Sequence, residues 1–109
     1  MIYLDSSVLL AHLFAEARRP DGAIWTERLV SSRLIKYEVL NRLHARRLGG
    51  AAFDAAVSLV RSMYLLDLAP DVLARAREPF PRPIRTLDGL HLASLMYLRR
   101  TERDVQLAT

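Results

Sequence analysis

The stretch MIYLDSSVLLAHLF (residues 1–14) decides the fold class of this chain. Its apolar residues 1–4 predict a short buried strand, which ends at Asp5. Ser6 and Ser7 are suited to cap the helix that the apolar residues 8–14 predict. A buried strand that passes directly into a helix is therefore expected to open the fold.

The rest of the chain continues this alternation of strands and helices. Turn signals rich in Gly, Pro and Asp occur at residues 18–22, 49–50 and 79–83. Apolar periodicity predicts further strands over residues 29–32, 64–68 and 105–108, and helices over residues 23–29, 34–48, 51–63, 72–78 and 86–97, the last capped by Thr86. Strands separated by helices imply right-handed crossovers and a parallel sheet covered on both faces. We therefore expect one domain over residues 1–109, a three-layer α/β/α sandwich in which the helix at residues 87–98 is among the most buried.

The composition narrows the class of protein. The chain has 109 residues, 51% of them apolar, which predicts one domain with its own core and excludes a disordered segment. It contains no cysteine, which excludes a disulfide scaffold, a thiolate zinc site and a cysteine nucleophile. The apolar runs are far shorter than the roughly 18 residues of a membrane span, and the acid at position 5 is unlike a signal peptide. We expect a soluble, cytoplasmic protein with no membrane partner.

The basic residues are almost all arginine. Of 16 basic side chains only Lys36 is lysine, and the net charge is +4. Arginine suits phosphate recognition because its planar fork pairs two oxygens at once, although skewed codon usage would produce the same enrichment. Residues 1–50 hold eight basic and five acidic side chains, whereas residues 51–109 hold eight and seven. Arg42 and Arg46 are therefore candidates for RNA contacts, with a solvated helix end as the alternative.

Three carboxylates are candidate site residues, and the rule that an open parallel sheet places its active site outside the carboxyl ends of its strands singles out Asp5 among them. Asp5 lies where the first strand passes into the first helix, Glu38 at the margin of an apolar helix stripe, and Asp88 in the first turn of an apolar helix. Each also has a structural interpretation. Asp5 is suited to cap a helix, Glu38 to pair with Arg42 four residues on, and Asp88 to complement a helix dipole.

Taken together, the three segments resemble a known family. IYLDSS (residues 2–7), SRLIKYEV (residues 32–39) and LDGLHLA (residues 87–93) resemble, in the right order, the signature segments of the PIN domain. The chain is most similar to VapC-type toxins of type II toxin–antitoxin systems. This resemblance implies a PIN-like fold and a Mg²⁺- or Mn²⁺-dependent endoribonuclease that cuts RNA phosphodiesters. It also implies a cognate antitoxin that holds the enzyme inactive, and family members are often homodimers.

The resemblance also assigns roles to individual residues. Asp5, Glu38 and Asp88 would form the catalytic set, with Asp5 and Asp88 as direct metal ligands and Glu38 as a further ligand or an orienter of metal-bound water. Oxygen ligands without sulfur or an imidazole set suit Mg²⁺ or Mn²⁺. Ser6 and Ser7 lie beside Asp5, where they would hold a water or phosphate oxygen if they do not cap the helix.

The chain departs from the family pattern at its end. The family usually carries a fourth acid just after the last strand, followed by a closing helix, whereas this chain ends at Thr109 and Asp104 lies at the wrong end of that strand. We therefore expect a C-terminally shortened domain, natural or truncated, that cleaves RNA poorly, with Thr109 as a supporting residue. The alternative is a catalytically weak or inactive PIN-like module that binds an antitoxin. His91, three residues after Asp88, is expected to be a structural histidine within hydrogen-bonding reach of it.

Overall fold

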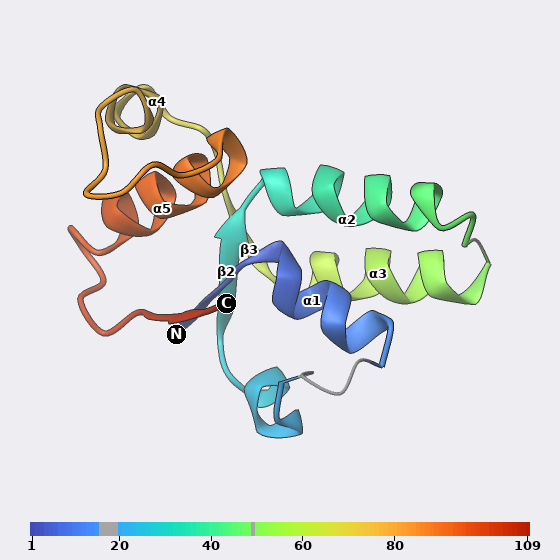
Figure 1. Cartoon of the computed structure of the whole chain (residues 1–109). Helices are drawn as coiled ribbons and strands as arrows, with labels where there is room; N and C mark the ends of the chain where they lie inside the picture. Colours follow the sequence, from blue (N-terminus) through green and yellow to red (C-terminus); the bar gives the residue numbers. More distant parts are fainter. Residues whose placement is uncertain (16–19, 49) are drawn as a thin grey trace.

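A computed structural model describes residues 1–15, 20–48 and 50–109 (Figure 1). Part of the turn predicted at residues 18–22, and the first residue of the turn at 49–50, lie outside the described residues.

Four short strands form one sheet in which all neighbours are parallel. The strands are β1 (Ile2–Leu4), β2 (Leu29–Ser32), β3 (Tyr64–Leu66) and β4 (Gln106–Ala108), in the order β3-β2-β1-β4. Tyr3 is in register with Val30 on one side and with Leu107 on the other. This confirms the predicted parallel sheet, and its carboxyl ends meet at one edge.

Helices cover both faces of this sheet. They are α1 (Ser6–Leu13), α2 (Leu34–Ala45), α3 (Ala51–Arg61), α4 (Pro70–Ala76) and α5 (Thr86–Leu98), with a 3₁₀ helix η1 (Gly22–Thr26) between α1 and β2. The helices α1, α2 and α3 lie on one side of the sheet and α4 and α5 on the other (Figure 1). The expected three-layer α/β/α sandwich is therefore confirmed.

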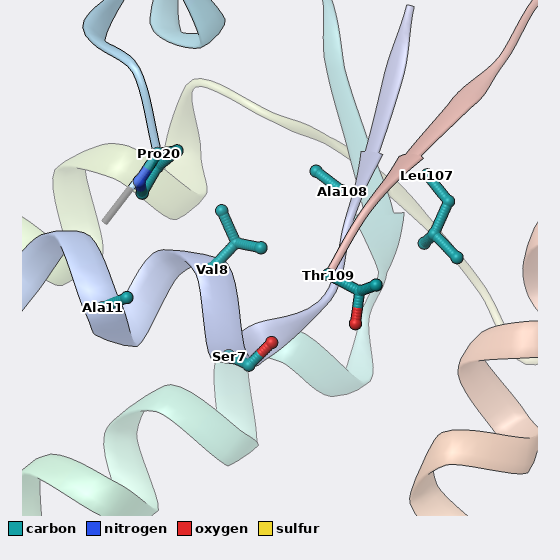
Figure 2. A pocket seen from close by; sticks show the side chains of 7 residues that line it. All are labelled: Ser7, Val8, Ala11, Pro20, Leu107, Ala108 and Thr109. Carbon is teal, nitrogen blue, oxygen red and sulfur yellow. The ribbon is translucent and has the colours of Figure 1, made fainter. Parts of the chain in front are cut away.

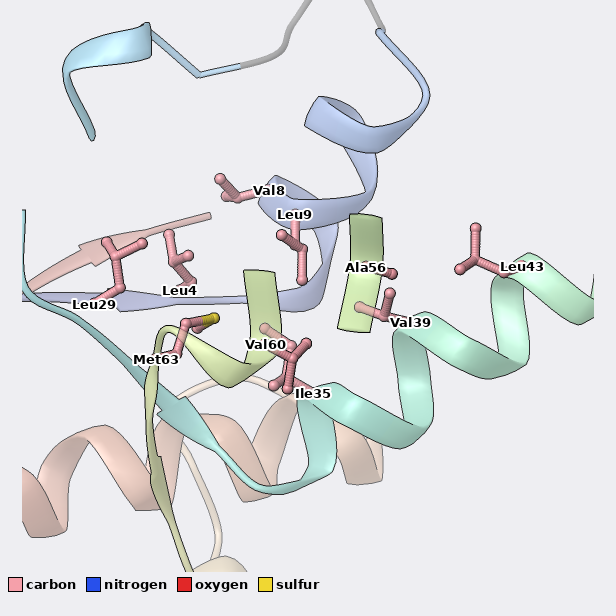
Figure 3. Packing of buried hydrophobic residues seen from close by; sticks show 10 residues of the cluster. All are labelled: Leu4, Val8, Leu9, Leu29, Ile35, Val39, Leu43, Ala56, Val60 and Met63. Carbon is pink, nitrogen blue, oxygen red and sulfur yellow. The ribbon is translucent and has the colours of Figure 1, made fainter. Parts of the chain in front are cut away.

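The core has two parts because successive residues of a strand point to opposite faces. Leu4 belongs to the larger cluster under α1, α2 and α3, and Tyr3 to the smaller one on the α5 side. The larger cluster contains Leu4, Val8, Leu9, Leu29, Ile35, Val39, Leu43, Ala56, Val60 and Met63 (Figure 3). The smaller one contains Tyr3, Val30, Leu95 and Val105. Tyr3 is completely buried and carries its hydroxyl toward α5.

Several element boundaries differ from the sequence prediction. The helix predicted at 34–48 ends at Ala45, because the chain turns through Arg47, which has a positive φ of 54°. The helix predicted at 23–29 is the shorter η1. The helix predicted at 72–78 begins at Pro70, since proline at a first helical position gives up no needed hydrogen bond. The strand predicted at 64–68 ends at Leu66.

Helix capping differs from expectation, whereas α5 is among the most buried of the described helices, as expected. Asp5 and Arg85, rather than Ser6, Ser7 or Thr86, occupy the N-cap positions of α1 and α5, and among the described residues neither makes a side-chain cap hydrogen bond. The helix α5 leaves Leu87, Met96 and Tyr97 exposed, and its buried residues are Gly89, His91, Ala93, Ser94 and Leu95. None of the described helices is long and apolar enough to cross a membrane.

Candidate functional site

Asp5 lies at the carboxyl end of β1, next to the last residue of the chain. Its backbone N–H donates to the carbonyl oxygen of Ala108 at 3.0 Å, because β1 and β4 run in parallel register. Its Oδ2 accepts hydrogen bonds from Ser7 Oγ at 3.0 Å and from Thr109 Oγ1 at 3.2 Å. Figure 2 shows Ser7 and Thr109 beside a neighbouring cavity of about 300 Å³ between α1 and β4. The carboxylate of Asp5 is therefore oriented by two hydroxyls rather than used as a helix cap.

Glu38 is held between α1 and α5. Its Oε2 accepts a hydrogen bond from Ser6 Oγ at 3.2 Å, and its Oε1 contacts His91 Nε2. Only 14% of the Glu38 side chain is exposed. Within the described part of the chain no ion pair joins Glu38 to Arg42, so the expected i,i+4 pair is not the contact that holds this carboxylate.

His91 is a buried histidine, as expected, and its hydrogen-bond partners are Tyr3 and Glu38. Its ring contacts Glu38 through Nε2 and lies with Nδ1 2.9 Å from the hydroxyl of Tyr3. Asp88 is exposed one turn earlier, at the N-terminal end of α5, where a carboxylate also complements the helix dipole. Glu38 is thus held by hydrogen bonds, whereas Asp88 is exposed.

A cleft of about 520 Å³ brings these side chains together from three helices. Asp5, Glu38 and Asp88 all line it, although they lie far apart in the sequence. The other residues that line it are Ser6, Ser7, Leu10, Phe14, Asn41, Arg42, Arg46, Arg85, Thr86 and Leu87. The cleft therefore combines an acidic part with arginines, and all the candidate residues of the sequence except Thr109 contribute to it.

A smaller cavity of about 120 Å³ lies next to this cleft. It shares Asp5 and Asp88 with the cleft and adds Tyr3, His91, Leu92, Leu95, Leu107 and Thr109. Asp5 and Asp88 thus line both the cleft and the smaller cavity, and Thr109 lines the smaller cavity.

The sequence reasoning missed Arg85 and Phe14. Arg85 precedes α5 and lines the cleft, three residues before Asp88. Phe14 follows α1, and the guanidinium carbon of Arg46 lies 3.8 Å from the centroid of its ring. An arginine two residues before the LDGLHLA segment was a usable signal, whereas nothing local to Phe14 indicates its contact with Arg46 at the end of α2.

The donor set fits a hard divalent cation in its chemistry. Asp5 and Asp88 offer carboxylate oxygens to the same two cavities, and the hydroxyls of Ser7 and Thr109 lie beside Asp5. Over residues 1–15, 20–48 and 50–109, however, no group of three or more histidine or acidic side chains is close enough to hold a metal ion. Asp5 and Asp88 line both cavities, whereas Glu38 is hydrogen-bonded to His91 and Ser6.

Comparison with known proteins places the chain in a family. Searches of curated proteins and of solved structures give no match. The family model of the PIN domain matches residues 2–100, which is most of the chain. The chain that folds into this sandwich and lines this cleft therefore belongs to the PIN domain family.

Proposed function

We propose that this chain is a Mg²⁺- or Mn²⁺-dependent endoribonuclease toxin of a toxin–antitoxin pair. PIN domains are generally nucleases, often toxins, and typically use divalent metals. The observation that carries the proposal is the cleft that Asp5, Glu38 and Asp88 line together with the arginines 42, 46 and 85. Such a cleft suits a cation on one side and a phosphodiester on the other.

The acidic part of the cleft provides the cation site. Asp5 and Asp88 would hold the ion, because clustered carboxylates repel one another until a cation neutralises them. The bound cation would supply an activated water and stabilise the charge of the phosphodiester during displacement. Glu38 would accept a hydrogen bond from the attacking water at Oε2, the oxygen that it shares with Ser6 of the cleft wall.

The basic part of the cleft provides the RNA contacts. Arg42, Arg46 and Arg85 can pair with phosphate oxygens through their planar guanidinium groups. Arg46 is stacked on Phe14, which gives the cleft a flat surface of the kind on which unpaired RNA bases stack. These features support a single-stranded RNA segment as substrate.

An antitoxin would inhibit this enzyme by filling the same cleft. The apolar face of an amphipathic segment would pack against Leu10 and Leu87. One lysine or arginine of the segment would pair with the carboxylates of Asp5 and Asp88. A cocrystal in which the partner leaves these carboxylates open to solvent contradicts this part of the proposal. In solution we expect the toxin itself to be a homodimer, as its relatives often are.

The test is cleavage of a fluorescent single-stranded RNA with Mn²⁺ by the wild type and by Asp5→Asn and Asp88→Asn. Removing one ligand costs several kcal/mol of transition-state stabilisation, so cleavage should fall by at least about 100-fold in each variant. The matched control is Asp54→Asn, because Asp54 is also an exposed aspartate in the first turn of a helix, α3. Full activity in Asp88→Asn, or loss of activity in Asp54→Asn, contradicts the proposed site.

The second candidate function is a catalytically weak or inactive module that binds an antitoxin. It is favoured by the engagement of Glu38 with His91, together with the lack of a three-ligand group among the described residues. A wild-type chain that binds the antitoxin but cleaves no RNA with Mg²⁺ or Mn²⁺ would establish this alternative.

A further inference from the structure

A buried chain of hydrogen bonds runs from the sheet to the cleft behind Glu38. The backbone N–H of Ser32, at the end of β2, donates to the Tyr3 hydroxyl at 3.1 Å. That hydroxyl lies 2.9 Å from His91 Nδ1, and His91 Nε2 contacts Glu38 Oε1. Tyr3 is fully buried and only 6% of the His91 side chain is exposed, so these hydrogen bonds are shielded from water.

We infer the direction of each hydrogen bond from its partners. The Tyr3 oxygen accepts from Ser32, and we infer that its own proton is donated to His91 Nδ1 rather than to the neighbouring hydroxyl of Ser31 or Ser94. Burial raises the pKa of Tyr3 to about 12, which keeps this hydroxyl protonated. With Nδ1 as acceptor, the ring carries its hydrogen on Nε2 and donates it to Glu38 Oε1.

This arrangement orients the two oxygens of Glu38 differently. His91 and Tyr3 are buried, whereas Ser6 lines the cleft together with Glu38. Oε1 is therefore held by a buried ring, and Oε2 is bonded to a residue of the cleft wall. The His91 ring is itself held edge-on to Tyr3, with ring centroids 5.9 Å apart and an interplanar angle of 81°.

We propose that His91 is a positioning residue, backed by Tyr3, that holds the Glu38 carboxylate with Oε2 facing the cleft. The catalytic consequence of this inference rests on the proposed nuclease function. Side chains that orient a functional carboxylate through hydrogen bonds typically contribute 10- to 100-fold to activity. His91 acts on the reaction only through Glu38, so its contribution disappears when Glu38 cannot act.

The kinetic test is a double-mutant cycle with His91→Leu and Glu38→Gln. We expect His91→Leu to lower kcat by about 10- to 100-fold with unchanged RNA binding, and the double variant to be no slower than Glu38→Gln alone. His91→Gln, whose amide N–H can replace Nε2–H, should recover part of the loss. The control is His44→Leu, an exposed histidine on α2. Additive losses, or equal losses in His91→Gln and His91→Leu, overturn the proposal.

A second measurement does not depend on activity, so it separates this inference from the proposed nuclease function. Nitrogen-15 NMR of the histidine rings should show hydrogen on His91 Nε2 in the wild type. Glu38→Ala should remove the protection of that hydrogen from exchange with water, and Tyr3→Phe should shift the Nδ1 resonance. If the wild type cleaves no RNA but these signals are found, the positioning role stands and the nuclease proposal fails. A wild-type ring without hydrogen on Nε2 overturns the positioning role.

Discussion

Replacing Tyr3 with phenylalanine tests the buried network most directly. The substitution keeps the aromatic ring in the core and removes the one oxygen that Ser32 N–H and His91 Nδ1 share. Each buried polar group left without a partner costs about 1–3 kcal/mol, and the hydroxyl itself no longer has to be desolvated. We expect the free energy of unfolding at pH 7 to fall by about 2–3 kcal/mol, which lowers Tm by roughly 10–15 °C in a domain of this size.

The effect of the same substitution on the free energy of unfolding should depend on pH. Burial raises the pKa of Tyr3 from 10.0 to about 12 in the folded chain. The neutral phenol therefore contributes stability that is fully present below pH 10 and is lost as the pH rises through about 12. Two pKa units correspond to about 3 kcal/mol. Because phenylalanine cannot ionise, the stability difference between wild type and Tyr3→Phe should shrink across this window.

The assay is urea unfolding followed by circular dichroism at pH 7, 10 and 11.5, with both proteins under identical conditions. The matched control is Tyr37→Phe, because Tyr37 is 64% exposed and its loss of a hydroxyl should change stability by less than about 0.5 kcal/mol at every pH. The reasoning is refuted if Tyr3→Phe is as stable as the wild type at pH 7, or if both lose the same stability between pH 10 and 11.5.

Four further predictions concern the cation site, the RNA contacts, a glycine within α5 and a glycine before α3. Asp5→Asn should abolish Mn²⁺ binding in calorimetry while leaving the far-UV spectrum unchanged; equal affinity in the two proteins would count against a ligand role. Arg46→Ala should weaken RNA binding and reduce the slope of log K against log salt by about 1, and an unchanged slope would remove Arg46 from the phosphate contacts. Gly89→Ala should raise Tm by about 4–8 °C, since an added Cβ meets its nearest neighbours at an ordinary 3.5 Å and a helix-interior glycine costs about 1 kcal/mol. Gly50→Ala, at φ +54°, should instead lower Tm, and a gain of stability there would contradict the strain argument.

The sequence by itself determined the layers of the fold and the sheet edge that carries the candidate site. Short apolar runs between segments of helical periodicity predict strands from local sequence alone. The first such run places Asp5 directly after a strand, independently of the tertiary contacts. Since the carboxyl ends of parallel strands meet at one edge, Asp5 and Thr109 were bound to become neighbours once β1 and β4 paired. The sequence predicted the helix ends less accurately, because the last turn of a helix depends on single backbone angles such as the positive φ of Arg47.

Only the tertiary structure decided which side chains meet across the cleft. Glu38 and His91 are 53 residues apart, and their contact depends on how α2 and α5 are placed around the end of the sheet. On the helix alone, Glu38 was as well suited to Arg42, and His91 to Asp88, because residues three or four apart share a helix face. Burial favours the contact between Glu38 and His91 over these local pairs. The His91 ring is buried beside Tyr3, and a buried polar ring requires hydrogen-bond partners, whereas Asp88 is exposed at the N-terminal end of α5. No local pattern encodes that choice, because it is made by the packing of both helices.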